Sequence, residues 1–126
     1  MKEEYIHQDI TSDIIGAFYD VYNELGFGFL EKVYENALKY KLEQIGYDVK
    51  KQVPINVYFE GVLVGEYFAD LIVDNNVIIE LKASDSLRKE HESQLINYLK
   101  ATKIEVGLLL NFGKKPEIKR KIFTNK

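Results

Sequence analysis

Residues 68–82 read Phe68-Ala69-Asp70-Leu71-Ile72-Val73-Asp74-Asn75-Asn76-Val77-Ile78-Ile79-Glu80-Leu81-Lys82. Two apolar runs flank a short polar segment, which is the pattern of two strands joined by a turn. Asp70 interrupts the first run, and Glu80 and Lys82 interrupt the second. Side chains alternate along a strand, so Glu80 and Lys82 share one face with Ile78. Because charged side chains are rarely buried without a partner or a metal ion, this stretch predicts a polar site on a sheet.

The length of the turn decides whether Asp70 lies beside Glu80. A two-residue loop places Asp70 opposite Leu81, on the wrong face of the sheet. A three-residue loop, residues 74–76, pairs Asp70 with Glu80, and the asparagines in it tolerate the left-handed conformation that such a loop needs. We therefore expect the longer loop, which gathers two carboxylates and the lysine on one patch.

Two neighbouring carboxylates resist joint ionisation, and a hard divalent cation such as Mg²⁺ or Mn²⁺ removes that penalty. A bound metal lowers the pKa of its water and neutralises phosphate charge, while Lys82 contacts the scissile phosphate or orients a water. The alternative is a buried ion pair between Lys82 and one carboxylate, because the spacing Asp-x(9)-Glu-x-Lys is loose.

The rest of the chain predicts a mixed α/β domain. Apolar residues recur at helical spacing in three segments and at strand spacing in five. In chain order, the expected elements are helices 9–25 and 29–45, strands 49–59, 62–73 and 77–83, helix 88–102, and strands 105–112 and 118–123. We expect strand 105–112 to be buried on both faces because it is almost entirely apolar.

Two further sets of polar residues are candidates for the same site. Gln94 and Tyr98 lie four residues apart on the third helix and share a face, so they either touch the site or form a polar margin of that helix. Glu31 heads the second helix, where it is either a third metal ligand or an acid favoured by the helix dipole.

Composition restricts the class of protein. The chain has 126 residues, the size of one domain, and no cysteine, which excludes disulfides and thiolate metal sites. We see neither a signal peptide nor an apolar run long enough for a membrane, so we expect a cytoplasmic protein. The net charge of −3 argues against a wide nucleic-acid footprint.

The basic residues are concentrated at the end of the chain. The last thirteen residues hold six basic residues and one acidic residue. Lys119, Arg120 and Lys121 are therefore candidate phosphate contacts, although a solvated edge strand explains them equally well. An open edge at strand 118–123 also makes a homodimer an expectation.

The whole set of motifs resembles the GxxExxY family, from about Ile10 to Phe123. The matching segments are Gly28-x-x-Glu31-x-x-Tyr34, Gly65 followed by Ala69-Asp70-Leu71, Glu80-Leu81-Lys82-Ala83, His91-Glu92-x-Gln94-Leu95-x-x-Tyr98-Leu99, Gly107-Leu108-Leu109-x-Asn111-Phe112, and Ile118-Lys119-Arg120. That family is placed in the PD-(D/E)XK nuclease-like superfamily, so the resemblance implies a restriction-endonuclease-like αβββαβ core. Helix 9–25 is additional to this core.

The resemblance also implies a site and an activity. Its metal site matches Asp70, Glu80 and Lys82, with the carbonyl of Leu81 as an extra ligand and Glu31 as the acid of the first core helix. Gln94-x-x-x-Tyr98 is similar to the helix motif of RecB-like exonucleases. The expected function is a Mg²⁺- or Mn²⁺-dependent nuclease acting on DNA or RNA. The alternative is a non-catalytic nucleic-acid-binding or protein-interaction module that retains the fold.

Overall fold

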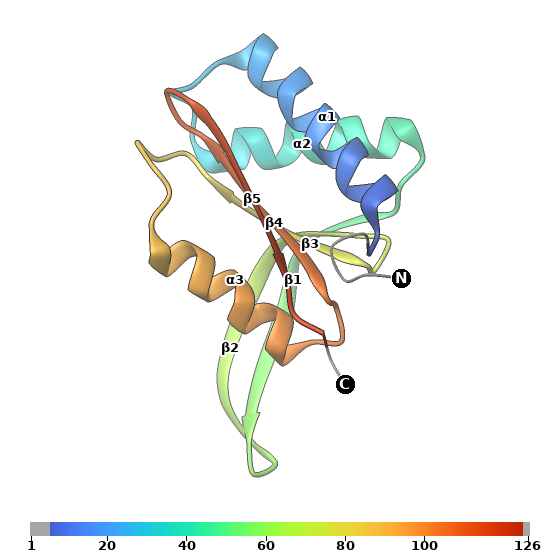
Figure 1. The fold of residues 1–126 in the computed structure, drawn as a ribbon, viewed down its shortest axis with the longest axis vertical. Coiled ribbons are helices and arrows are strands. Elements are labelled where there is room, and N and C mark those ends of the chain that lie inside the picture. The colour runs from blue at the N-terminus through green and yellow to red at the C-terminus, as the bar shows by residue number, and fades with distance from the viewer. Residues whose placement is uncertain (1–5, 125–126) are drawn as a thin grey trace.

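A computed structural model describes residues 6–124 and contains a five-stranded sheet with three helices (Figure 1). The described elements are α1 (Gln8–Leu25), α2 (Glu31–Ile45), β1 (Val49–Phe59), β2 (Val62–Val73), β3 (Val77–Lys82), α3 (Lys89–Ala101), β4 (Val106–Phe112) and β5 (Pro116–Ile122). Every boundary lies within two residues of the boundary expected from the sequence. Within residues 6–124, no helix combines the length and hydropathy that a membrane crossing requires.

The sheet is mixed and has the strand order β1-β2-β3-β4-β5. Only β3 and β4 are parallel, and α3 makes the crossover between them. Helices α1 and α2 pack on one face of the sheet, and α3 packs on the other (Figure 1). Strand β4 is buried at all seven positions, which confirms the expectation that both of its faces are covered.

Helix α1, the addition to the expected core, covers the end of β4. The ring of Phe18 packs edge-on against Phe112 with 4.7 Å between centroids. The hydroxyl of Tyr22 lies 2.8 Å from the carbonyl oxygens of Gly113 and Lys114. This helix therefore holds the β4–β5 turn as well as closing the apolar core.

Tyr34 explains part of the Gly28-x-x-Glu31-x-x-Tyr34 motif. Its buried ring stacks on Phe112 at 4.2 Å, and its hydroxyl donates to the carbonyl of Gly26 at 2.6 Å. The same hydroxyl accepts a hydrogen bond from the Phe29 N–H at 3.2 Å. Gly28 has a φ of 112°, which L side chains rarely adopt. The motif thus ties down the α1–α2 link and sets where α2 begins.

Strands β1 and β2 change phase partway along. Residues two apart in a regular strand share a face, but Leu71 packs with α1 and α2 whereas Ala69 packs with α3. The break lies at Gln52 and Asp70, which face each other outside the regular pairing. The residues on either side of them are paired, and Gln52 has a left-handed φ of 52°. Beyond this break the two strands continue as an arm that extends past the rest of the sheet (Figure 1). We call residues 53–69 the arm.

Candidate active site

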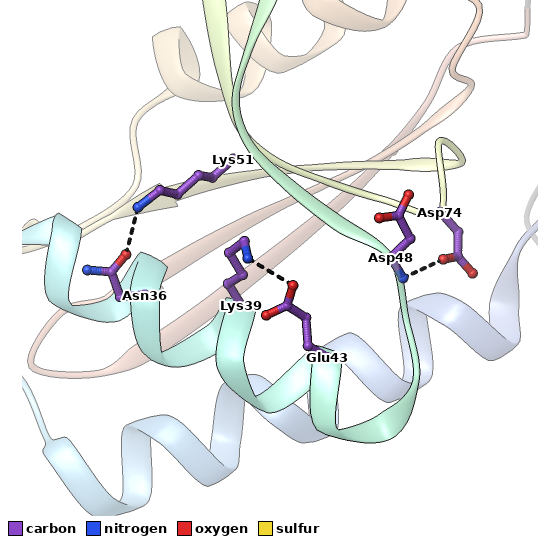
Figure 2. A network of polar contacts seen from close by, with 6 residues as sticks. All are labelled: Asn36, Lys39, Glu43, Asp48, Lys51 and Asp74. Atoms are coloured by element: carbon purple, nitrogen blue, oxygen red, sulfur yellow. Dashed lines mark hydrogen bonds and ion pairs between the residues drawn. The ribbon is translucent and has the colours of Figure 1, made fainter.

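The turn between β2 and β3 has three residues, as predicted. Val73 pairs with Val77, and Asp74 and Asn75 have left-handed φ values of 51° and 57°. Asp74 is held in this conformation by Asp48, the residue before β1. The Asp48 N–H donates to the Asp74 carboxylate at 2.9 Å (Figure 2), and the Asp74 N–H donates to the Asp48 carbonyl at 2.8 Å. The loop that sets the register is thus braced by the neighbouring strand.

Asp70 and Glu80 meet just past the point where β2 and β3 separate. The ladder of paired residues between these strands ends at Leu71 and Ile79. Beyond it, the Asp70 N–H donates to Glu80 Oε2 at 2.8 Å, and the Leu81 N–H donates to Asp70 Oδ2 at 2.8 Å. Two carboxylates thus serve as acceptors for backbone amides, which confirms that Asp70 and Glu80 are cross-strand neighbours.

Glu80 is electrostatically strained. Its side chain is buried, with 7% of its surface exposed. Burial, followed by the negative charge of Asp70, raises the pKa of Glu80 to about 8, although the Asp70 N–H and the charge of Lys82 both act to lower it. A carboxyl group with this pKa holds a proton at neutral pH unless a cation compensates for its charge.

Gln52 and Glu35, which the sequence did not single out, extend the set of hydrogen-bonded polar side chains around Asp70. The Gln52 amide donates to Glu35 Oε1 at 2.9 Å and to Asp70 Oδ1 at 3.3 Å. Glu35 of α2 is buried, and burial followed by the charge of Asp70 raises its pKa. The available signal for Glu35 was its helical spacing with the buried Leu38 and Leu42, three and seven residues later.

Glu31 lies on the solvent-exposed side of these hydrogen-bonded side chains. It is exposed at the first position of α2 and lines a cleft of about 430 Å³ together with Glu35, Gln52 and Asp70. Lys32 and Lys51 complete the lining. Lys51 is positioned by a hydrogen bond from its ammonium to the Asn36 side chain at 3.2 Å (Figure 2). The cleft therefore combines carboxylates with cations.

Gln94 and Tyr98 approach the site from α3. The Gln94 amide donates to the Tyr98 hydroxyl at 2.7 Å. Burial, followed by the charge of Glu80, raises the pKa of Tyr98. His91 lies one turn earlier and has a structural role: its Nδ1 accepts a hydrogen bond from the Arg88 N–H and caps the helix.

Comparison with known families decides the identity of this fold. The family model described as "PD-(D/E)XK nuclease superfamily" matches residues 8–121. The chain belongs to the PD-(D/E)XK nuclease superfamily. A comparison with curated proteins gave no match. The crystal structure of SSO0001 is similar, with a TM-score of 0.57 and 20% sequence identity, over 76% of this chain and 52% of that one. The chain thus spans about half of that protein, and the likeness shows the fold.

PD-(D/E)XK nucleases generally use divalent metals. The donors at this site are oxygen atoms, which suit Mg²⁺ or Mn²⁺, and the raised pKa of Glu80 shows that its ionised form needs a compensating cation. In the described part of the chain, no three Asp, Glu or His side chains form a ready metal-binding group. Because Mg²⁺ is commonly held by one or two carboxylates together with water and substrate phosphate, Asp70 and Glu80 fit the ion without a third side chain.

The basic residues of β5 are partly engaged within this PD-(D/E)XK domain. Lys121 forms an ion pair with Glu92 of α3 at 2.6 Å, and this contact lowers the pKa of Glu92. The Arg120 guanidinium donates to the carbonyl of Ile6 at 2.6 Å. Lys119 is exposed. These contacts attach β5 to α3 and to the segment before α1, and phosphate binding by the three residues stays a prediction.

Proposed function

We propose that this chain is a metal-dependent nuclease that hydrolyses phosphodiester bonds in DNA or RNA, and that within its superfamily it belongs to the GxxExxY family. The observation that carries the proposal is the pair Asp70 and Glu80. Glu80 is buried beside the carboxylate of Asp70, so its ionisation costs free energy unless a cation is bound, and a carboxyl group with such a raised pKa is typical of functional sites. A carboxyl group with a purely structural role would gain nothing from this destabilisation.

Each residue has a proposed role. Asp70 and Glu80 hold a divalent cation, with the carbonyl of Leu81 and the carboxylate of Glu31 as additional ligands. The cation supplies Lewis-acid stabilisation of the phosphate and a water of lowered pKa. Lys82 shares the face of Glu80 and places its ammonium against a phosphate oxygen.

On the other side of the carboxylates, Gln94 and Tyr98 position the phosphodiester. The hydrogen bond between them fixes both side chains, so the tyrosine hydroxyl and the amide are pre-oriented for a phosphate oxygen. Lys119, Arg120 and Lys121 are proposed as a weak phosphate-contacting edge, where Lys121 exchanges Glu92 for phosphate. A homodimer, paired through the edge strand β5, would bring two such edges together.

A non-catalytic binding module is the alternative function. The observation in its favour is that the carboxylates of Asp70 and Glu80 already accept hydrogen bonds from backbone amides and from Gln52. In that reading the carboxylates hold the β2–β3 junction together and the protein binds nucleic acid without cutting it.

The deciding experiment measures cleavage of labelled single-stranded and duplex DNA and RNA with Mg²⁺, Mn²⁺ or EDTA. The expected result is cation-dependent cleavage by the wild type and none by Glu80→Gln. Glu24→Gln is the matched control, because Glu24 is an exposed glutamate of α1. Binding of nucleic acid without cleavage by the wild type in every cation would support the non-catalytic module.

A further inference from the structure

A second and larger hollow lies between the arm and α3. It encloses about 1010 Å³ and is separate from the carboxylate cleft, since the two share no lining residue. One wall is the arm, with Tyr58, Val64 and Tyr67; the other is α3, with Ser93, Gln94 and Tyr98. The arm forms the first of these walls because the phase change at Gln52 turns it toward α3.

The lining suits a ligand with flat rings and phosphates. Tyr58 and Tyr67 are 61% and 46% exposed, so ring surface is open to a partner. Tyr67 also packs against Tyr98 at 5.7 Å, which fixes its ring. The lining also includes Asn56 and Asn97, and the basic residues Lys89 and Lys100 against the single acidic residue Glu90. The ammonium of Lys100 lies 5.7 Å from the centre of the Phe123 ring.

The hollow adjoins the candidate active site through two side chains of α3. Gln94 and Tyr98 belong to both, because they line the hollow and carry the hydrogen bond described for the site. Tyr98 also packs in one cluster with Ala69, the residue before Asp70, and with Ile78, which shares the face of Glu80. The Tyr98 wall of the hollow therefore lies near the strand segments that carry Asp70 and Glu80.

We propose that this hollow is a binding groove for a single strand of nucleic acid, whose bases stack on Tyr58 and Tyr67 and whose backbone leads to Asp70 and Glu80. Aromatic side chains in a mildly basic groove are the usual platform for unpaired bases. A duplex buries its base faces in its own stack and leaves nothing for these rings to contact. The low positive charge of the groove also fits one backbone better than two. This inference rests on the proposed nuclease function.

The test compares two neighbouring aromatic residues at the tip of the arm. Tyr58 lines the groove, whereas Phe59 does not and is equally exposed at 64%. Binding of a fluorescent oligothymidylate about 15 nucleotides long is measured by anisotropy in EDTA. Tyr58→Ala should weaken binding about 5-fold to 150-fold, the loss expected for one stacked base, and Phe59→Ala should leave it within about 2-fold.

Two further measurements separate the groove from the catalytic proposal. Glu80→Gln should keep wild-type oligothymidylate binding while losing cleavage, and a blunt DNA duplex should compete poorly. Wild-type binding that depends on Tyr58 without any cleavage would support the groove and overturn the nuclease function. Cleavage with unchanged binding by Tyr58→Ala would overturn the groove alone.

Two other results would also overturn the groove. One is equal competition by the duplex. The other is a Tyr58→Ala variant that leaves oligothymidylate binding intact but converts an oligomer into a monomer by light scattering, which would identify the arm as a protein interface.

Discussion

Replacing Glu80 with glutamine removes a buried charge and should stabilise the metal-free protein at alkaline pH. In the folded chain the pKa of Glu80 is about 8, whereas an ordinary glutamate has a pKa of 4.5. Between these values the folded state keeps a proton that the unfolded state has released. The folded state therefore binds more protons, and the free energy of unfolding falls as the pH rises through this window.

The size of the effect follows from the two pKa values. Each pH unit in the window lowers the free energy of unfolding of the wild type by about 1.4 kcal/mol, so the loss is at most about 5 kcal/mol by pH 8. Glutamine stays neutral and its carbonyl still accepts from the Asp70 N–H. We expect Glu80→Gln to gain about 2 to 5 kcal/mol over the wild type near pH 8 and to match it within about 1 kcal/mol near pH 5.

Urea unfolding in EDTA across this pH range measures the difference directly. Glu24→Gln should follow the wild-type curve, because Glu24 is exposed. Excess Mn²⁺ should narrow the gap: an ion at 100 times its dissociation constant stabilises the wild type by about 2.7 kcal/mol and leaves Glu80→Gln unchanged. Wild-type and Glu80→Gln curves that stay parallel from pH 5 to about pH 8 would refute the reasoning, because Glu80 would then be ionised without cost.

Three other substitutions test separate parts of the structure. Lys82→Ala should abolish cleavage and change stability by only about 0.5 kcal/mol in urea unfolding, whereas a large destabilisation would instead indicate a buried ion pair. Gln52→Ala removes the hydrogen-bond donor to buried Glu35 and should destabilise the fold by about 1 to 3 kcal/mol; no loss would mean that water replaces the amide. Gly107→Ala places a methyl group 2.7 Å from a Leu95 methyl carbon and should destabilise by about 1 to 3 kcal/mol in thermal unfolding, and the same change should cost less in a Leu95→Ala background if the clash is the cause.

The register of β2 and β3 was predictable because it depends on local sequence. Alternation fixes which residues of Val77–Lys82 share a face, and the loop needs residues that tolerate a left-handed backbone. Asp74 and Asn75 are such residues. The position of Asp70 beside Glu80 then follows from counting along the two strands.

The polar partners of Asp70 were not predictable in the same way. Glutamine has no intrinsic preference for a positive φ, so nothing in the sequence around Gln52 indicates the break in β1. The unfavourable backbone of Gln52 is offset by hydrogen bonds to Glu35 and Asp70, which come from other elements. A contact between distant segments cannot be obtained from the spacing within one of them.

The basic segment shows the same limit. Its charges were visible in the sequence, but the partners of Lys121 and Arg120 lie on α3 and near the start of the chain. Sequence alone gives the sign and number of charges on β5, and the tertiary fold decides which of them remain open to a ligand.

The two amide hydrogen bonds at the β2–β3 junction make the site observable by NMR. The N–H groups of Asp70 and Leu81 each point at a carboxylate oxygen, so their proton frequencies depend on the charge of that carboxylate. Loss of a proton from Glu80 shifts the Asp70 amide, and a cation bound to both carboxylates shifts both signals. In a ¹⁵N-labelled sample, these two resonances report protonation and ligand occupancy separately from any turnover.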